Sequence, residues 1–162
     1  MVDARGIEVS VPGGEWLRLR HLVLDLNGTL ALEGRLLPGV RDGIEALRGA
    51  LEIHLLTADT FGRARAVAAS LGVPATVLPA GEAGGPAKER FVRELGAAFV
   101  AAMGNGVNDA AMLRSSALGI CVLGPEGCAP GTLLAARVVV RSPADGLRLL
   151  LNPSLLAATL RP

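Results

Sequence analysis

Four polar groups along this chain are of the types that phosphoryl transfer requires. Asp25 offers a carboxylate nucleophile, Thr57 a hydroxyl that can bind phosphoryl oxygens, and Lys88 an ammonium. The fourth group is the glycine-bracketed loop 104–109, with the sequence Gly-Asn-Gly-Val-Asn-Asp. Together these groups would supply a nucleophile, hydrogen bonds and positive charge to one reacting centre. Two neighbouring carboxylates would also attract a divalent cation, and Mg²⁺ prefers such oxygen ligands.

Lys88 is the only lysine among the 16 basic residues of the chain. A compact ammonium differs from the planar guanidinium fork of arginine when it faces a single oxygen. If all basic positions were equivalent, the probability that the only lysine occupies one given position would be about one in sixteen. The composition therefore favours a role at Lys88 that arginine could not fill.

The apolar pattern predicts the elements that must position these groups. The run 22–26 reads as a buried strand, and further strands are predicted at 51–56, 73–78, 98–103, 117–123 and 136–140. Helices are predicted from 40 to near 49, over 64–71, around 88–95, after 109 and from 143, and a hairpin over 7–11 and 16–20. Open parallel sheets bind ligands beyond the carboxyl ends of their strands, so all four groups are expected at one sheet edge.

Each of these residues also has a purely structural explanation. Asp25 could begin a turn or cap a helix, and Thr57 could be a β-branched strand end. The loop 104–109 could be a simple Gly/Asn turn, which explains its glycines but not the order of all four groups. Asp59 could either support the site electrostatically or cap the following helix.

Composition narrows the class of protein. A chain of 162 residues that is 51% apolar, with a formal charge of +1, suits one domain over 1–162, with a hairpin over 1–20 and a core over 21–151. Scattered arginines and few aromatics argue against a nucleic-acid partner, and no apolar run approaches the ~18 residues that span a membrane. The N-terminus lacks the apolar core of a signal peptide, and Cys121 and Cys128 lack metal or disulfide spacing. We therefore expect a cytoplasmic protein with two unpaired thiols.

The four groups, in this order, resemble the motifs of the haloacid dehalogenase superfamily and, within it, the phosphorylation domain of P-type ATPases. The ATPase pattern Asp-Lys-Thr-Gly-Thr-Leu-Thr is mirrored by residues 25–31, and Thr-Gly-Asp by residues 57–59. The pattern Gly-Asp-Gly-x-Asn-Asp is mirrored by residues 104–109, and Lys88 falls where the family keeps its lysine. The resemblance covers roughly residues 20–151. It implies a three-layer, Rossmann-like α/β fold with a mostly parallel sheet.

The resemblance also implies a role for each matching residue. Asp25 would form an aspartyl phosphate, Asn108 would hydrogen-bond the phosphoryl group, and Asp109 would orient Lys88. The catalytic set is Asp25, Asn27, Lys88 and Asp109, the substrate-binding set is Thr57, Ala58, Lys88 and Asn108, and the Mg²⁺ set is Asp25, Asn27, Asn105 and Asp109. Asn27 would contribute its backbone carbonyl to the metal.

Two residues depart from the family pattern. Phosphatases of the superfamily carry a second aspartate as general acid/base two residues after the nucleophile, a role worth about 10²- to 10⁴-fold in rate, and here that residue is Asn27. An amide cannot shuttle a proton, so the aspartyl phosphate should hydrolyse slowly. Asn105 replaces the usual metal-binding aspartate, which should weaken Mg²⁺ binding or transfer that role to Asp109.

Only 31 residues separate Asp25 from Thr57, which leaves no room for a cap domain or a nucleotide-binding domain. Capless members of the superfamily act on large substrates or close their sites by oligomerising, so the resemblance implies a macromolecular substrate or a homo-oligomer. Three hypotheses follow: a Mg²⁺-dependent phosphatase acting on a phosphorylated small molecule or macromolecule, a slow autophosphorylating relative of the ATPase domain, or a binding module that has lost its chemistry. The retained Lys88 argues against the third.

Overall fold

The computed structural model describes residues 6–58, 63–79 and 83–162. A six-stranded sheet lies at the centre, with the strand order β10-β9-β8-β3-β6-β7 and every pair parallel. Its strands are β3 (His21–Asp25), β6 (Glu52–Thr57), β7 (Ala75–Val77), β8 (Val100–Gly104), β9 (Leu118–Val122) and β10 (Val138–Val140). The predicted parallel sheet is confirmed.

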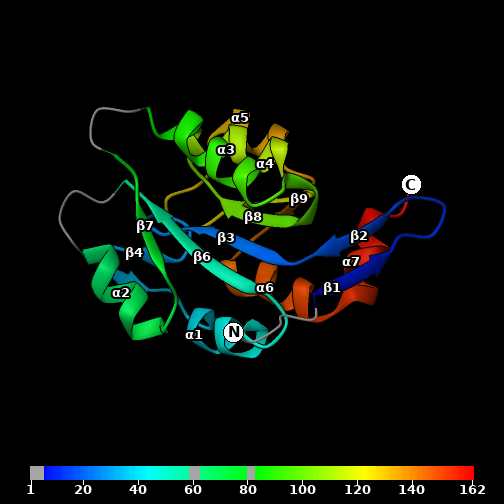
Figure 1. Ribbon diagram of the computed structural model, residues 1–162, viewed down its shortest axis with the longest axis horizontal. Coiled ribbons are helices and arrows are strands. Elements are labelled where there is room, and N and C mark those ends of the chain that lie inside the picture. The colour runs from blue at the N-terminus through cyan, green and yellow to red at the C-terminus, as the bar shows by residue number, and fades with distance from the viewer. Residues whose placement is uncertain (1–5, 59–62, 80–82) are drawn as a thin grey trace.

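Helices cover both faces of this sheet and make three layers. On one face lie α1 (Val40–Leu47), α2 (Arg63–Leu71) and α6 (Pro143–Leu151), and on the other α3 (Gly84–Glu94), α4 (Ala110–Ser115) and α5 (Pro130–Ala135) (Figure 1). Strands β8 and β9 are buried at every position. Continuous apolar strands are expected where both faces of a parallel sheet are covered.

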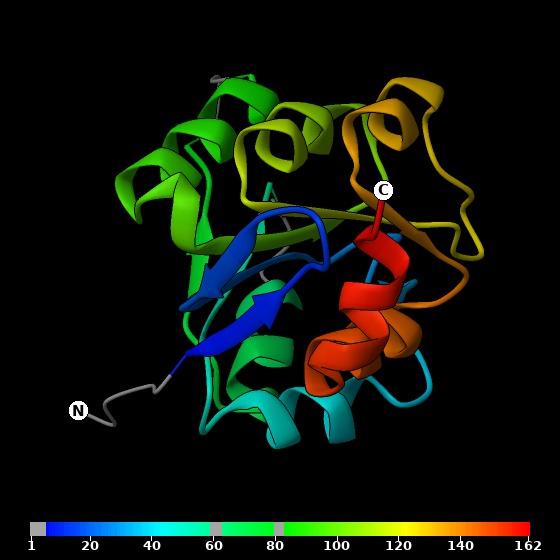
Figure 2. The same cartoon turned by 90° about the vertical axis from the view of Figure 1, so that its right-hand side faces the viewer.

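A separate antiparallel hairpin precedes the sheet, as predicted. It consists of β1 (Ile7–Ser10) and β2 (Trp16–Leu19), and Ile7 pairs with Leu19. Alternate residues of the hairpin are buried, so one of its faces joins the larger apolar core. The last helix, α7 (Pro153–Leu160), packs beside β1 (Figure 2).

The described residues contain no cap domain. Between β3 and β6 lie only the small hairpin of β4 (Ala31–Leu32) and β5 (Arg35–Leu36) and helix α1. Between β6 and α3 the described residues form only α2 and β7. The expectation of a capless fold is therefore confirmed. None of the helices in the described ranges is long and apolar enough to cross a membrane.

The structure corrects several predicted elements. The hairpin β4–β5 and helix α5 were not expected, since both are too short to carry a periodic pattern. The final helix is two helices, because α6 ends at Leu151 and Pro153 starts α7. The strand predicted over 98–103 begins at Val100, after the 3₁₀ turn η1 (Ala97–Phe99), and the strand predicted over 73–78 is only β7. Asp59 lies outside the described residues.

Candidate active site

A buried lysine joins two carboxylates at the carboxyl edge of the sheet. The Lys88 Nζ lies 2.6 Å from Oδ1 of Asp25 and 2.7 Å from Oδ1 of Asp109. The Lys88 and Asp109 side chains are fully buried, and the side chain of Asp25 is 11% exposed. Buried charges of this kind are tolerated only when they are paired and hydrogen-bonded.

Three elements carry this triad. Asp25 is the last residue of β3, which pairs in parallel with β6 on one side and with β8 on the other. Asp109 ends the 3₁₀ turn η2 (Val107–Asp109), which follows β8. Lys88 lies in the first half of α3, on the side of that helix buried with Ala87 and Val92. Parallel strands end at one edge, so residues far apart in the sequence meet there.

Asp109 is held in place by the turn that precedes it. Its Oδ2 accepts hydrogen bonds from the backbone N–H groups of Asn105 and Gly106, both at 2.9 Å. The backbone of Gly104 comes so close that an added Cβ would lie 2.4 Å from Cγ of Asp109, which only glycine permits. Both oxygens of Asp109 are therefore engaged, Oδ1 by Lys88 and Oδ2 by the turn.

Thr29, a residue outside the predicted site sets, links Asp25 to Asn105. Its hydroxyl lies 3.1 Å from Oδ2 of Asp25 and 3.0 Å from Oδ1 of Asn105. One hydroxyl carries one proton, so it donates to only one of these two oxygens at a time. The Asn105 amide donates to the carbonyl of Gly127 at 3.1 Å, which points its Oδ1 toward Thr29. The side-chain oxygens of Asp25 and Asn105 therefore converge near Thr29, and carboxylate and amide oxygens are ligands that suit Mg²⁺.

Glu126 is a further carboxylate that the sequence patterns did not reveal. It lies in the loop after β9, with its side chain against Gly28. Gly28 has a φ of 78°, and an added Cβ there would meet Oε2 of Glu126 at 2.2 Å. The loop has no periodic pattern, and only the packing of Gly124 and Gly127 near residues 28 and 105 brings Glu126 to the site.

The remaining predicted site residues surround this network. Thr57 is buried at the end of β6, one residue beyond Leu56, which pairs with Asp25. Asn108 is exposed and lies against Gly84, where an added Cβ would be 3.3 Å from the Asn108 amide nitrogen. Asn27 and Ala58 are exposed beside the site. Their roles toward a substrate remain predictions.

The electrostatics of the triad follow from burial and pairing. Burial, followed by repulsion from Asp109, raises the pKa of Asp25 to about 6, against the opposing pull of Lys88. Burial by itself would lower the pKa of Lys88, but the charges of Asp25 and Asp109 outweigh it and the pKa is raised. When all three groups are ionised the triad carries a net charge of −1, which favours a bound cation.

Comparison with known proteins identifies the class. The chain matches the haloacid dehalogenase-like hydrolase family over residues 6–116, more than half of its length, and it belongs to that family. The sequence resemblance to this superfamily is thereby confirmed.

Two relatives extend the comparison. The uncharacterized protein MJ0073 of Methanocaldococcus jannaschii is 47% identical over 62 residues, which are 38% of this chain and 67% of that protein. A copper-transporting P-type ATPase of Rhizobium leguminosarum bv. viciae is 38% identical over 117 residues, which are 67% of this chain. The chain spans only 13% of the length of that ATPase.

Among solved structures, the chain is similar to the 3-deoxy-D-manno-octulosonate 8-phosphate phosphatase of Moraxella catarrhalis, crystallised with magnesium, phosphate and the sugar acid. The TM-score is 0.68 at 17% identity, covering 86% of this chain and 90% of that chain. This likeness shows the fold.

Proposed function

We propose that this family member is a Mg²⁺-dependent phosphatase that acts through an aspartyl phosphate on Asp25. The observation that carries the proposal is the buried Lys88, held within 2.7 Å of both Asp25 and Asp109. Burying a lysine and two carboxylates carries a large desolvation cost. Buried titratable groups of this kind are found preferentially at functional sites. Family membership and the four ordered motifs support the same assignment.

In the first step the Asp25 carboxylate attacks phosphorus, the bond from phosphorus to the leaving oxygen breaks, and the leaving group takes a proton from water. Lys88 holds Asp25 in place and neutralises negative charge, while Thr57 and Asn108 bind phosphoryl oxygens. In the second step water attacks the aspartyl phosphate, which releases inorganic phosphate and restores Asp25. When bound by Asp25, Asn105 and the backbone of Asn27, Mg²⁺ supplies positive charge that stabilises the transferring group.

The open site favours substrates that need no cap to hold them. Between β3 and α3 the described residues contain no domain that could act as a cap. We propose a phosphorylated small molecule or a macromolecule with an accessible phosphate as the substrate. A homo-oligomer would close the site in the absence of a cap.

A second candidate function is a long-lived phosphoenzyme, in keeping with the resemblance to the phosphorylation domain of P-type ATPases. Asn27 favours it, because this exposed amide stands where a proton-transferring carboxylate would act. The chain would then phosphorylate itself from a small phosphodonor, and the phosphorylated state would be its output.

An acid-quenched time course of the intact mass tests both candidates. The protein is mixed with Mg²⁺ and acetyl phosphate, and Asp25→Asn is run alongside. An adduct that needs Asp25 and decays with release of phosphate supports the phosphatase, and a persistent adduct supports the second candidate. If neither adduct nor phosphate forms while Mg²⁺ still binds, the chain is a binding module and the proposal is wrong.

Asn27→Asp separates the two candidates further. Restoring a carboxylate that can activate water should speed decay of the adduct by about 10²- to 10⁴-fold. Asn27→Ser serves as the matched control, since it changes the same exposed position without adding a carboxylate. Equal decay rates in both variants would contradict a proton-transfer role for this position.

A further inference from the structure

We propose that His21, Glu52 and His54 form a second metal site, which binds a divalent transition-metal ion of the Zn²⁺ class. His21 Nδ1 lies 3.3 Å from His54 Nε2. The Glu52 carboxylate lies 3.5 Å from His21 Nδ1 through Oε2 and 3.7 Å from His54 Nε2 through Oε1. The chain has two histidines, and both are in this cluster.

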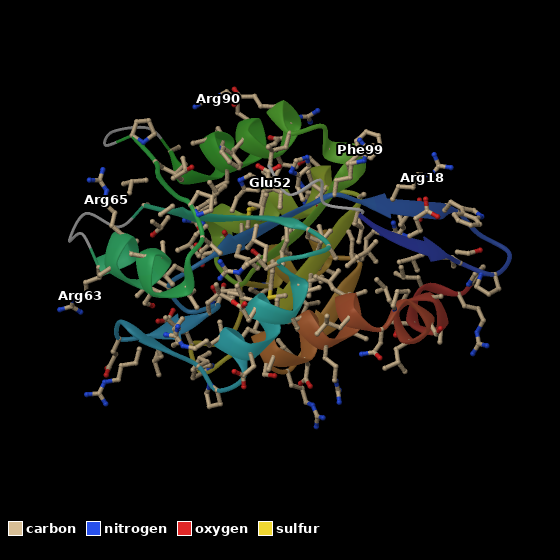
Figure 3. All side chains as sticks on the ribbon, turned by 60° about the horizontal axis from the view of Figure 1, so that its bottom comes forward. Arg18, Glu52, Arg63, Arg65, Arg90 and Phe99 are labelled. Carbon is tan, nitrogen blue, oxygen red and sulfur yellow. The ribbon has the colours of Figure 1, made fainter. Side chains whose placement is uncertain are left out.

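The sheet register brings the three residues together. His21 pairs with Glu52 across β3 and β6, and Val23 pairs with His54. Side chains two residues apart on a strand share a face, so all three point to the side covered by α3. There His54 packs edge-on against Phe91 of α3, with ring centroids 5.6 Å apart. Figure 3 shows Glu52 where β6 begins.

This cluster is distinct from the phosphoryl site. His21 begins the strand that Asp25 ends, which places them about 13 Å apart at ~3.3 Å per residue. The three ligands come from the amino-terminal halves of β3 and β6, whereas the phosphoryl site lies beyond their carboxyl ends. The proposal therefore does not depend on the function proposed above.

The spacing of the two histidine nitrogens matches two ligands of a tetrahedral ion, and the Glu52 carboxylate lies close to both. Ligands held ~2.0 to 2.1 Å from such an ion lie about 3.3 to 3.4 Å from each other. The two ring nitrogens are 3.3 Å apart, and the two Glu52 oxygens lie 3.5 Å from His21 Nδ1 and 3.7 Å from His54 Nε2, so one ion can reach both rings and one carboxylate oxygen after a small movement of Glu52. The Glu52 side chain is 61% exposed, so its free rotation can close this small gap, and water can supply the fourth ligand.

The ligand types select the metal. Two imidazoles and one carboxylate suit Zn²⁺ and its neighbours in the first transition row, whereas Mg²⁺ prefers oxygen alone. Imidazole binds metal in its neutral form, and burial lowers the pKa of His54 against the pull of Glu52. A bound ion would join β3 to β6 at the end of the sheet opposite Asp25.

The same contacts could also exist without an ion, as a hydrogen bond between the two rings and an ion pair with Glu52. The test is calorimetric titration of the chelator-treated full chain with ZnCl₂, in buffer that contains excess Mg²⁺ to occupy the oxygen site. We expect one Zn²⁺ per chain. The Zn²⁺ affinity should fall at least about 10- to 100-fold in each of the variants His21→Gln, His54→Gln and Glu52→Gln. A loss of that size is seen even when a residue that only supports a metal ligand is replaced.

Two controls locate the ion. Asp25→Asn should leave Zn²⁺ binding unchanged, as should Glu94→Gln, which removes an exposed carboxylate at the far end of α3. Glu52→Gln changes an exposed side chain, so it tests the site even if a histidine variant fails to fold. In the unaltered protein, the ring proton signals of its two histidines should both shift at one equivalent of Zn²⁺.

Three results would overturn the proposal: no Zn²⁺ binding with unchanged histidine signals, Zn²⁺ binding that survives in Glu52→Gln and in whichever histidine variants fold, or binding that is lost in Asp25→Asn. The last would place the ion in the phosphoryl site.

Discussion

At the scale of single residues, the ionised carboxylate of Asp25 destabilises the fold. Asp25 is buried beside Asp109, and its pKa is raised to about 6. A folded pKa above the ordinary value of 3.8 means that the native state holds this proton more tightly than the unfolded chain does. Stability from this group is therefore present at low pH and is lost as pH rises from about 4 through about 6. The nucleophilic attack proposed for Asp25 would require this ionised, destabilised form.

Asp25→Asn should remove the loss of stability that the ionised Asp25 causes. Above pH 7, without Mg²⁺, we expect the variant to be more stable than the unaltered protein by on the order of 3 kcal/mol, and the difference should shrink toward pH 4. Urea unfolding at several pH values measures it. Asp42→Asn, which changes an exposed carboxyl on α1, is the control and should show no such trend. A constant difference between pH 4 and pH 8 would disprove the argument.

We expect the Glu126 carboxylate to supply part of the negative charge that the neutral Asn105 does not bring to the Mg²⁺ site. Its carboxylate lies against Gly28 next to the converging oxygens of Asp25 and Asn105, where negative charge favours a divalent cation. Glu126→Gln should weaken Mg²⁺ binding several-fold, as measured by titration calorimetry, with the fold unchanged because the residue is exposed. Glu94→Gln is the matched control. Equal Mg²⁺ affinities in both variants would show that Glu126 takes no part.

At the scale of elements, the turn between β8 and α4 decides whether the triad forms. Gly104→Ala would place a methyl group 2.4 Å from Cγ of Asp109, so the carboxylate must move and Lys88 loses a partner. We expect a loss of about 1 to 3 kcal/mol in unfolding free energy, and slower formation of the phosphoryl adduct.

Gly131→Ala is the control for that turn, because a Cβ at this position in α5 meets nothing within 4 Å. It should be neutral or slightly stabilising, since alanine favours a helix over glycine. If Gly104→Ala forms the adduct as fast as Gly131→Ala does, Asp109 does not position Lys88.

At the scale of the whole molecule, the first strand of the described residues and the last helix are packed together. Helix α7 lies against the hairpin strand β1, and Leu156 of α7 is fully buried within the main apolar cluster. Leu156→Ala should lower the unfolding free energy by about 2 to 5 kcal/mol, through lost burial and the cavity left behind.

Leu155→Ala tests whether this effect comes from burial. Leu155 is the neighbouring leucine and is 51% exposed, so its truncation should cost well below 1 kcal/mol. Thermal unfolding of both variants provides the comparison. Similar losses in the two would mean that α7 is held by something other than Leu156.

The parallel sheet and the residues at its carboxyl edge could be predicted from the amino-acid sequence. Apolar runs that end in Asp25, Thr57 and the loop 104–109 are local patterns, and a parallel sheet places all its strand ends on one side. Composition alone distinguished Lys88, because it is the only lysine in the sequence. Short elements such as β4 and β5, with two residues each, and α5, with six, were not predicted, because so few residues carry no clear period.

The contacts between these side chains could not be predicted from the sequence and are seen in the folded structure alone. Thr29 joins Asp25 to Asn105, Glu126 reaches Gly28, and His21 meets His54, each across segments whose alignment no local pattern records. The physical reason is register: a shift of one residue between β3 and β6 would turn His54 to the opposite face of the sheet from His21. Packing between distant strands fixes that register, so a pattern along the chain can place side chains on an element but cannot pair them across elements.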